Sequence, residues 1–122
     1  MAEREKLADA VVKLARALTF EKKAKSDHFY SAGLAKSFEI CFEYAWKYFR
    51  RAAAEHGLDA FSPRDAIKTA GRLGLIGDVE AWLGYLEDRN LSVHDYLGIH
   101  DQDYLKTIKA FYLSAKDLLS RE

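Results

Sequence analysis

Apolar residues recur along this chain at the three- and four-residue spacing of an α-helix, and polar or charged residues fill the positions between them. The first such segment runs from Glu3 to about Lys23. Its narrow apolar stripe, typical of an outer helix of a bundle, consists of Leu7, Val11, Leu14 and Leu18. The second segment, from about His28 to His56, has a broad aromatic face and is followed by Gly57, a common stop signal. It predicts the central helix.

Three further helical segments follow: Ser62 to about Leu73, Asp78 to about Leu97, and Asp101 to the end of the chain. Each begins with a residue whose side chain can cap a helix, and Pro63 suits the first turn of the shortest one. Gly74 and Gly98 are placed to end the first two. The sequence has no strand pattern, internal repeat or linker. It therefore predicts one all-α domain, residues 1–122, folded as an antiparallel up-and-down bundle of four long helices and one short one.

Length and composition agree with a single domain, because 122 residues of which 49% are hydrophobic suffice for one core. No apolar run approaches the roughly 18 residues of a membrane span, and no apolar signal-peptide core follows Met1 to Lys6. We therefore expect a cytoplasmic protein without a membrane segment. The single cysteine, Cys41, excludes an internal disulfide and lies among aromatic and aliphatic residues, so we expect it to be buried.

The charge of the chain is balanced, with 19 Lys and Arg residues against 19 Asp and Glu residues. This balance argues against a generally basic nucleic-acid-binding surface, so any RNA contact is expected to be local. Two clusters are candidates for such a contact, namely Lys22, Lys23 and Lys25, and Lys47, Arg50 and Arg51. The favoured interpretation of both clusters is a solvated helix face, with cations near a helix C-terminus offsetting its dipole.

The sequence offers little for a metal or an organic cofactor. His94 and His100 lie across a predicted helix break, and no other residue completes a common zinc set. The aspartates that could hold a cation only if folding gathered them are Asp88, Asp95 and Asp101. The glycines within residues 71–77 lack the lysine and the preceding strand of a P-loop. We therefore expect no cofactor and metal-free chemistry.

Groups that can act on phosphate are concentrated in RNLSVHDY, Arg89 to Tyr96, near the end of the fourth helical segment. At about 100° per residue, Asn90 and His94 share one helix face, and Arg89 and Tyr96 fall on an adjacent stripe. An arginine offers a fixed fork of donors to phosphate oxygens, and a histidine exchanges a proton near neutral pH. This combination is suited to the cleavage of a phosphodiester.

Each of these residues also has a purely structural interpretation. Arg89 beside Glu87 and Asp88 fits a surface ion-pairing residue, and judged on the residues alone this interpretation is favoured. His94 fits an amphipathic residue at the edge of the bundle, and Tyr96 fits a packing aromatic near a helix end. Two acidic residues of the second segment would support the motif only if they turn toward it, and these are Glu39 and Glu43.

The spacing of Arg89, His94 and Tyr96 resembles the R-x4-H-x-Y form of the HEPN motif. Three segments are similar, in order and spacing, to the HEPN proteins long labelled nucleotidyltransferase substrate-binding proteins: FEICFEYAWK (38–47), SPRDAIKTAGRLGLI (62–76) and WLGYLEDRNLSVHDY (82–96). The resemblance covers about residues 5 to 120. It implies a metal-independent ribonuclease in which Arg89, His94 and Asn90 are catalytic. It also implies a homodimer with paired motifs and an MNT-type nucleotidyltransferase antitoxin that attaches adenylate to Tyr96.

The older family label implies a different function, a non-catalytic subunit that helps a small nucleotidyltransferase to bind its acceptor substrate. Both functions imply the same partner, and they differ on whether His94 does chemistry. The complete set of Arg89, His94 and Tyr96 favours the ribonuclease. A third possibility, a degenerate structural member of the family, is left open by the zero net charge.

Overall fold

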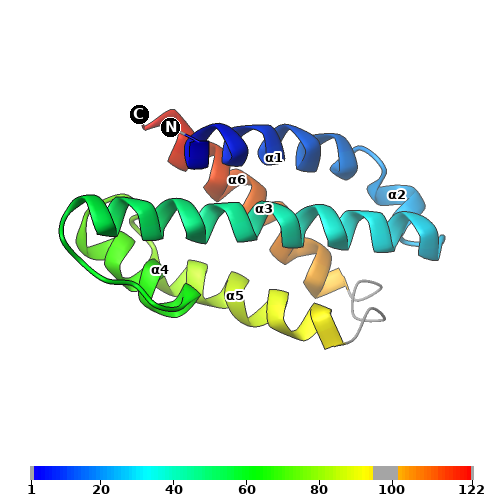
Figure 1. The fold of residues 1–122 in the computed structure, drawn as a ribbon. Coiled ribbons are helices and arrows are strands. Elements are labelled where there is room, and N and C mark those ends of the chain that lie inside the picture. The colour runs from blue at the N-terminus through cyan, green and yellow to red at the C-terminus, as the bar shows by residue number, and fades with distance from the viewer. Residues whose placement is uncertain (1, 95–101, 122) are drawn as a thin grey trace.

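A computed structural model describes residues 2–94 and 102–121 of the chain. Within these ranges it contains the helices α1 (Ala2–Leu18), α2 (Glu21–Ala24), α3 (His28–Glu55), α4 (Pro63–Arg72), α5 (Val79–His94) and α6 (Gln102–Ser120). The prediction of an all-α bundle is confirmed. In Figure 1 the long helix α3 crosses the middle of the molecule, with α1 along one side, α4 and α5 along the other, and α6 behind. Both described ends of the chain lie side by side, where the Arg4 guanidinium donates to the Leu119 carbonyl at 3.0 Å.

Helix ends in the middle of the chain lie where the capping residues predict them. Gly57 has a φ of 72°, and the amide of Leu58 reaches back to the Ala53 carbonyl at 2.9 Å, which closes the end of α3 in a Schellman motif. The Ser62 hydroxyl accepts a hydrogen bond from the Asp65 amide at 3.1 Å at the start of α4. The Asp78 carboxylate accepts one from the Ala81 amide at 3.0 Å at the start of α5. The predicted end at Leu97 and the predicted cap at Asp101 lie outside the described residues.

The first predicted helix is wrong in its length, because the segment from Glu3 to Lys23 divides into α1 and α2. The amides of Thr19 and Phe20 bond to carbonyls three residues earlier, at 3.1 and 3.0 Å, which tightens and ends α1. The Phe20 ring then stacks on Tyr30 of α3, with centroids 5.5 Å apart and planes at 27°. This contact, between residues on either side of α2, favours a turn at a point where the apolar pattern of the sequence continues as a helix.

The aromatic part of the core lies between α3, α5 and α6, and buried aliphatic residues of α1 and α4 complete it. Phe38 and Phe42 of α3 both contact Phe111 of α6, with centroids 5.2 and 5.9 Å apart. Trp82 of α5 lies edge-on to Phe49 at 5.0 Å. The four phenylalanine side chains are fully buried. Because burying one such side chain stabilises a fold by roughly 1.5–3 kcal/mol, this cluster fixes the relative positions of the three helices.

Candidate functional site

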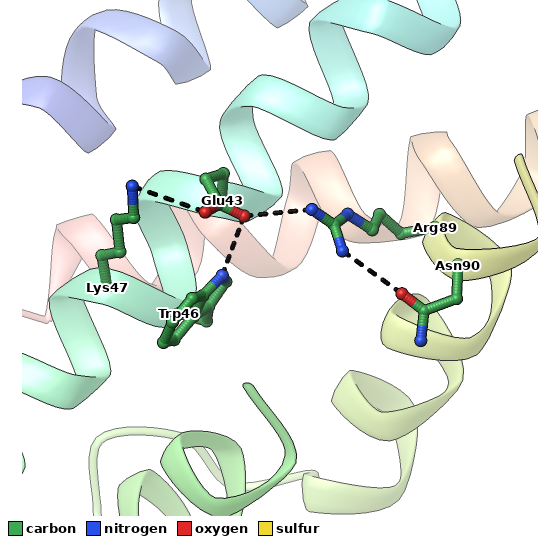
Figure 2. Close-up of polar contacts among 5 residues, drawn as sticks. All are labelled: Glu43, Trp46, Lys47, Arg89 and Asn90. Carbon is green, nitrogen blue, oxygen red and sulfur yellow. Dashed lines mark hydrogen bonds and ion pairs between the residues drawn. The ribbon is translucent and has the colours of Figure 1, made fainter. Parts of the chain in front are cut away.

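Arg89 lies near the C-terminal end of α5 and faces α3. Its Nη2 donates to the Glu43 Oε2 of α3 at 3.1 Å, and its Nη1 donates to the Asn90 Oδ1 at 3.2 Å (Figure 2). The side chains of Arg89 and Glu43 are 26% and 32% exposed, so the ion pair lies at the protein surface without being fully solvated. Partial burial and a charged donor and acceptor strengthen such a contact beyond an ordinary surface pair.

Glu43 joins several groups at this site. Its Oε2 also accepts a hydrogen bond from the Trp46 indole at 2.9 Å, and its Oε1 pairs with the Lys47 ammonium at 3.4 Å (Figure 2). Partial burial alone would raise the pKa of Glu43. The Trp46 hydrogen bond, Lys47 and the charge of Arg89 together outweigh burial and lower this pKa. Glu43 is therefore an ionised carboxylate at neutral pH and holds the guanidinium by charge as well as by geometry.

The position of α5 is fixed by two hydrogen bonds to α6 in the turn that precedes Arg89. The Thr107 hydroxyl donates to Asp88 at 2.6 Å, and the Tyr85 and Ser114 hydroxyls are 2.7 Å apart. Asp88 directly precedes Arg89 in the chain. A carboxylate that is tied to α6 at this point helps to direct the next side chain toward α3.

A pocket of about 240 Å³ lies beside the guanidinium, between α3 and α5. Its described lining, given in chain order, is Lys36, Glu39, Ile40, Glu43, Tyr44, Lys47 and Arg89. Three cations, two carboxylates and an aromatic ring therefore surround one small volume. Such a pocket can bind a phosphate through Arg89 and the lysines while an apolar wall contacts a ribose or a base.

The structure brings together part of the predicted site. Arg89, Asn90 and Glu43 are in contact, and Glu39 lines the same pocket. His94 is the last residue of α5, so one uninterrupted helix connects it to Arg89, but its side chain lies outside the described residues. Tyr96 is also outside them. The association of the guanidinium with the imidazole and the phenol stays a prediction.

Sequence reasoning missed Trp46 and Lys36 as members of this site, and it placed Lys47 only in a basic cluster. Trp46 and Lys47 lie three and four residues after Glu43. That spacing places all three on one face of α3 and was the available signal. The spacing does not indicate, however, that this face of α3 contacts Arg89 of α5.

The other sequence predictions concern residues around the site. Cys41 is fully buried, as predicted, and burial raises the pKa of its thiol to about 12. In the basic clusters, Arg50 lies over the Trp46 ring at 4.9 Å and Lys23 over the Tyr30 ring at 5.2 Å. In the described parts of the chain, no three His, Cys, Asp or Glu side chains gather as a potential metal site. No helix in residues 2–94 and 102–121 is long and apolar enough to cross a membrane.

Comparison with known proteins identifies the family. A curated relative from Haemophilus influenzae, "Probable ribonuclease HepT", is 31% identical over 70 residues, which represent 53% of this chain and 48% of the relative. The chain thus spans about half the length of the curated relative it matches. The family described as "Nucleotidyltransferase substrate binding protein like" matches residues 3–121. Because that match covers nearly the whole chain, the protein belongs to this family of HEPN proteins.

Proposed function

We propose that the protein is a metal-independent endoribonuclease, the toxin of a toxin–antitoxin pair. The observation that carries this proposal is the Arg89 guanidinium, held by Glu43 and Asn90 at the wall of a pocket that also contains Lys36 and Lys47. The name of the curated relative, "Probable ribonuclease HepT", supports the same activity. In this proposal the partner is an MNT-type nucleotidyltransferase, which neutralises the toxin by attaching adenylate to Tyr96.

The proposed reaction is transesterification at an RNA phosphodiester. The His94 imidazole removes the proton of the 2′-hydroxyl, the 2′-oxygen bonds to phosphorus, and the bond from phosphorus to the 5′-oxygen breaks. The departing oxygen takes a proton from a second, protonated imidazole, that of His94 in the other copy of a dimer, which leaves a 2′,3′-cyclic phosphate and a 5′-hydroxyl. Arg89 stabilises the negative charge that builds up on the phosphorane, and Asn90 orients the guanidinium or a phosphate oxygen.

One chain supplies one such histidine, whereas in-line cleavage benefits from an acid and a base on opposite sides of phosphorus. We therefore propose a two-fold symmetric homodimer in which both copies of the 89–96 segment meet at the seam. Glu43 supports the reaction by holding Arg89, and Glu39 contributes a second carboxylate at the edge of the same pocket.

The ribonuclease activity is tested with the purified protein and a labelled RNA, without added metal and with EDTA. We expect cleavage products that end in a 2′,3′-cyclic phosphate. Arg89→Ala and His94→Ala should each lower kcat by about 10² to 10⁴-fold. The control is Arg121→Ala, which removes an exposed arginine that pairs with Asp117 four residues earlier. RNA left uncut by the wild-type protein, or cut equally by the variants, would contradict the proposal.

Control by the partner is tested by mixing the protein with its nucleotidyltransferase, ATP and Mg²⁺. Intact-mass spectrometry should show additions of adenylate mass that are absent in Tyr96→Phe. Each adenylate places negative charge and bulk near the guanidinium that is meant for the RNA phosphate, so the modified protein should lose activity. Tyr96→Phe should stay active with the partner present. Adenylate found on another residue would remove Tyr96 from this role.

The second candidate is a non-catalytic subunit that presents an acceptor substrate to the nucleotidyltransferase. The description of the matching family as nucleotidyltransferase substrate binding proteins favours it. In that case the purified protein leaves RNA uncut, and it accelerates adenylate transfer by the partner to a third molecule. His94→Ala would then leave this acceleration unchanged, which separates the two functions in one pair of assays.

A further inference from the structure

A large hollow lies away from the Arg89 pocket, where α1, α2 and the beginning of α3 meet. Its volume is about 790 Å³, and its described lining includes Phe20, Phe29 and Tyr30 together with Lys13 and Arg16. None of the described residues that line it is acidic, although Asp and Glu make up 19 of the 122 residues of the chain. The hollow therefore combines aromatic surface with positive charge.

The aromatic rings of this hollow form a connected group with one member at the surface. Tyr30 stacks on Phe20 and meets Phe29 edge-on, with centroids 5.5 Å apart in both pairs. Phe29 is 78% exposed. The Lys13 ammonium pairs with Asp9 at 3.0 Å, but these side chains are 73% and 65% exposed, so this ion pair is weak and easily exchanged. An exposed ring beside exposed cations is an arrangement that proteins use to bind single-stranded nucleic acid.

A third hollow lies between this one and the Arg89 pocket and shares lining residues with both. The third hollow, of about 290 Å³ between α1 and α3, shares Lys13 and Ser37 with the first one. It shares Ile40 and Tyr44 with the Arg89 pocket. We name the three adjoining hollows the α3 groove. Along α3, Phe29 is fourteen residues from Glu43, or roughly 21 Å at 1.5 Å per residue.

The α3 groove is more positive than the rest of the protein. Its described lining contains six Lys and Arg residues and three Asp and Glu residues, in a chain with 19 of each. The cations lie along the whole groove, from Arg16 at one end to Arg89 at the other. Because the chain as a whole has no net charge, it can attract RNA only through a locally positive surface. The α3 groove is such a surface.

We propose that the α3 groove binds a single-stranded segment of RNA, with one base stacked on Phe29 and its phosphates held by Lys13 and Arg16. This inference rests on the proposed function, because it takes Arg89 as the place where the RNA is cut. A span of about 20 Å accommodates several nucleotides. Contacts made several nucleotides away from the cleaved bond position the RNA, and they take no part in the chemistry.

A second copy of the chain is a poorer occupant of the end of the groove near Phe29. In a two-fold interface each patch faces its own copy or a symmetry-related equivalent. An acid-free patch centred on the two-fold axis would then place Lys13 and Arg16 against the same cations of the other copy. The phosphate backbone of RNA supplies the opposite charge, and its bases supply flat surfaces for Phe29.

The test measures binding of a fluorescent 2′-O-methyl oligonucleotide of about ten nucleotides, which lacks the attacking hydroxyl and so is not cleaved. Phe29→Ala should weaken binding about tenfold. The control is Phe61→Ala, because Phe61 is 85% exposed and outside the α3 groove. Arg16→Ala should lower the slope of log affinity against log salt by about one. Arg121→Ala should leave that slope unchanged, because Arg121 pairs with Asp117 and lies outside the α3 groove.

Cleavage kinetics separate this inference from the proposed function. Phe29→Ala should raise KM for a ten-nucleotide RNA about tenfold with kcat unchanged, and it should leave cleavage of a dinucleotide unchanged, since a dinucleotide does not reach the ring. Unchanged oligonucleotide binding and KM in Phe29→Ala would overturn the inference while the ribonuclease stands. If the wild type binds the oligonucleotide, and the variants lose affinity as expected, but the wild type cleaves no RNA, the ribonuclease proposal is overturned. The role of the α3 groove in binding RNA then stands.

Two other occupants would also overturn the inference. The surface is an interface between copies if Phe29→Ala changes the sedimenting mass while Arg16→Ala binds the oligonucleotide as tightly as the wild type does. If Phe29→Ala abolishes capture of the nucleotidyltransferase and leaves oligonucleotide affinity unchanged, the surface binds that protein.

Discussion

At the scale of single residues, Glu43 has two opposing effects on Arg89. It fixes the direction of the guanidinium through a 3.1 Å contact, and it occupies donors that a phosphate would otherwise use. Trp46 and Lys47 share the same carboxylate, so its charge is already partly satisfied when RNA arrives. Displacing Glu43 from one side of the Arg89 guanidinium by a phosphate should therefore require less free energy than separating an isolated ion pair, because Trp46 and Lys47 still satisfy the carboxylate.

The lowered pKa of Glu43 leads to a prediction about stability and pH. The carboxylate stabilises the folded protein fully above the ordinary glutamate value of 4.5, and this contribution is lost as pH falls through the lowered pKa. Glu43→Gln should therefore reduce the free energy of unfolding by up to about 1 kcal/mol at pH 7. The difference from the wild type should shrink as the pH falls from 6 to 3. Urea unfolding at each pH measures it.

The matched control for Glu43→Gln is Glu55→Gln. Glu55 pairs with Arg51 on its own helix, and the two side chains are 62% and 60% exposed, so little change in stability is expected. A Glu43→Gln difference that stays constant or grows toward pH 3 would show that the charge of this carboxylate does not stabilise the fold.

At the scale of helices, the sequence predicted α3, α4 and the start of α5 well because their ends depend on local chemistry. Capping side chains and glycines at positive φ act within five residues, so a pattern in the sequence is sufficient to locate them. The break after α1 depends on Phe20 stacking on Tyr30, which is a tertiary contact. The pairing of Glu43 with Arg89 likewise depends on the position of α3 relative to α5 along the helix axes, which is set by tertiary packing. Periodicity gives the faces of two helices but not their relative shift.

A pair of glycine substitutions tests this account of the helix ends. Gly57→Ala should destabilise the fold by about 1 kcal/mol, because a side chain disfavours the φ of 72° that closes α3. Gly84→Ala should instead stabilise it by roughly 0.5–1 kcal/mol. Gly84 lies inside α5, and a Cβ added there meets nothing within 4 Å. Urea unfolding of both variants provides the comparison. A Gly57→Ala variant that is as stable as the wild type, or more stable, would contradict the assignment of Gly57 as the stop of α3.

At the scale of the whole molecule, the proposed site has one histidine per chain, so we expect efficient cleavage to need a second copy. The prediction is a homodimer, and equilibrium sedimentation at micromolar concentration should give twice the mass of the chain. The activity per chain should fall on dilution below the dissociation constant of the dimer, because separated chains lose one of the two proton-transfer groups. A monomer that retains full activity per chain would contradict the paired site.

The long helix α3 packs against α1, α2, α4 and α5, and its Phe38 also contacts Phe111 of α6. The amides at its centre consequently become accessible only when all of these contacts are lost together. Their hydrogen exchange should be the slowest in the protein and should report the free energy of global unfolding. The four-residue α2 packs mainly against α3 and should exchange through local opening. This difference would let the Phe29 end of the groove adjust to a bound strand while the helix that carries Glu43 remains intact.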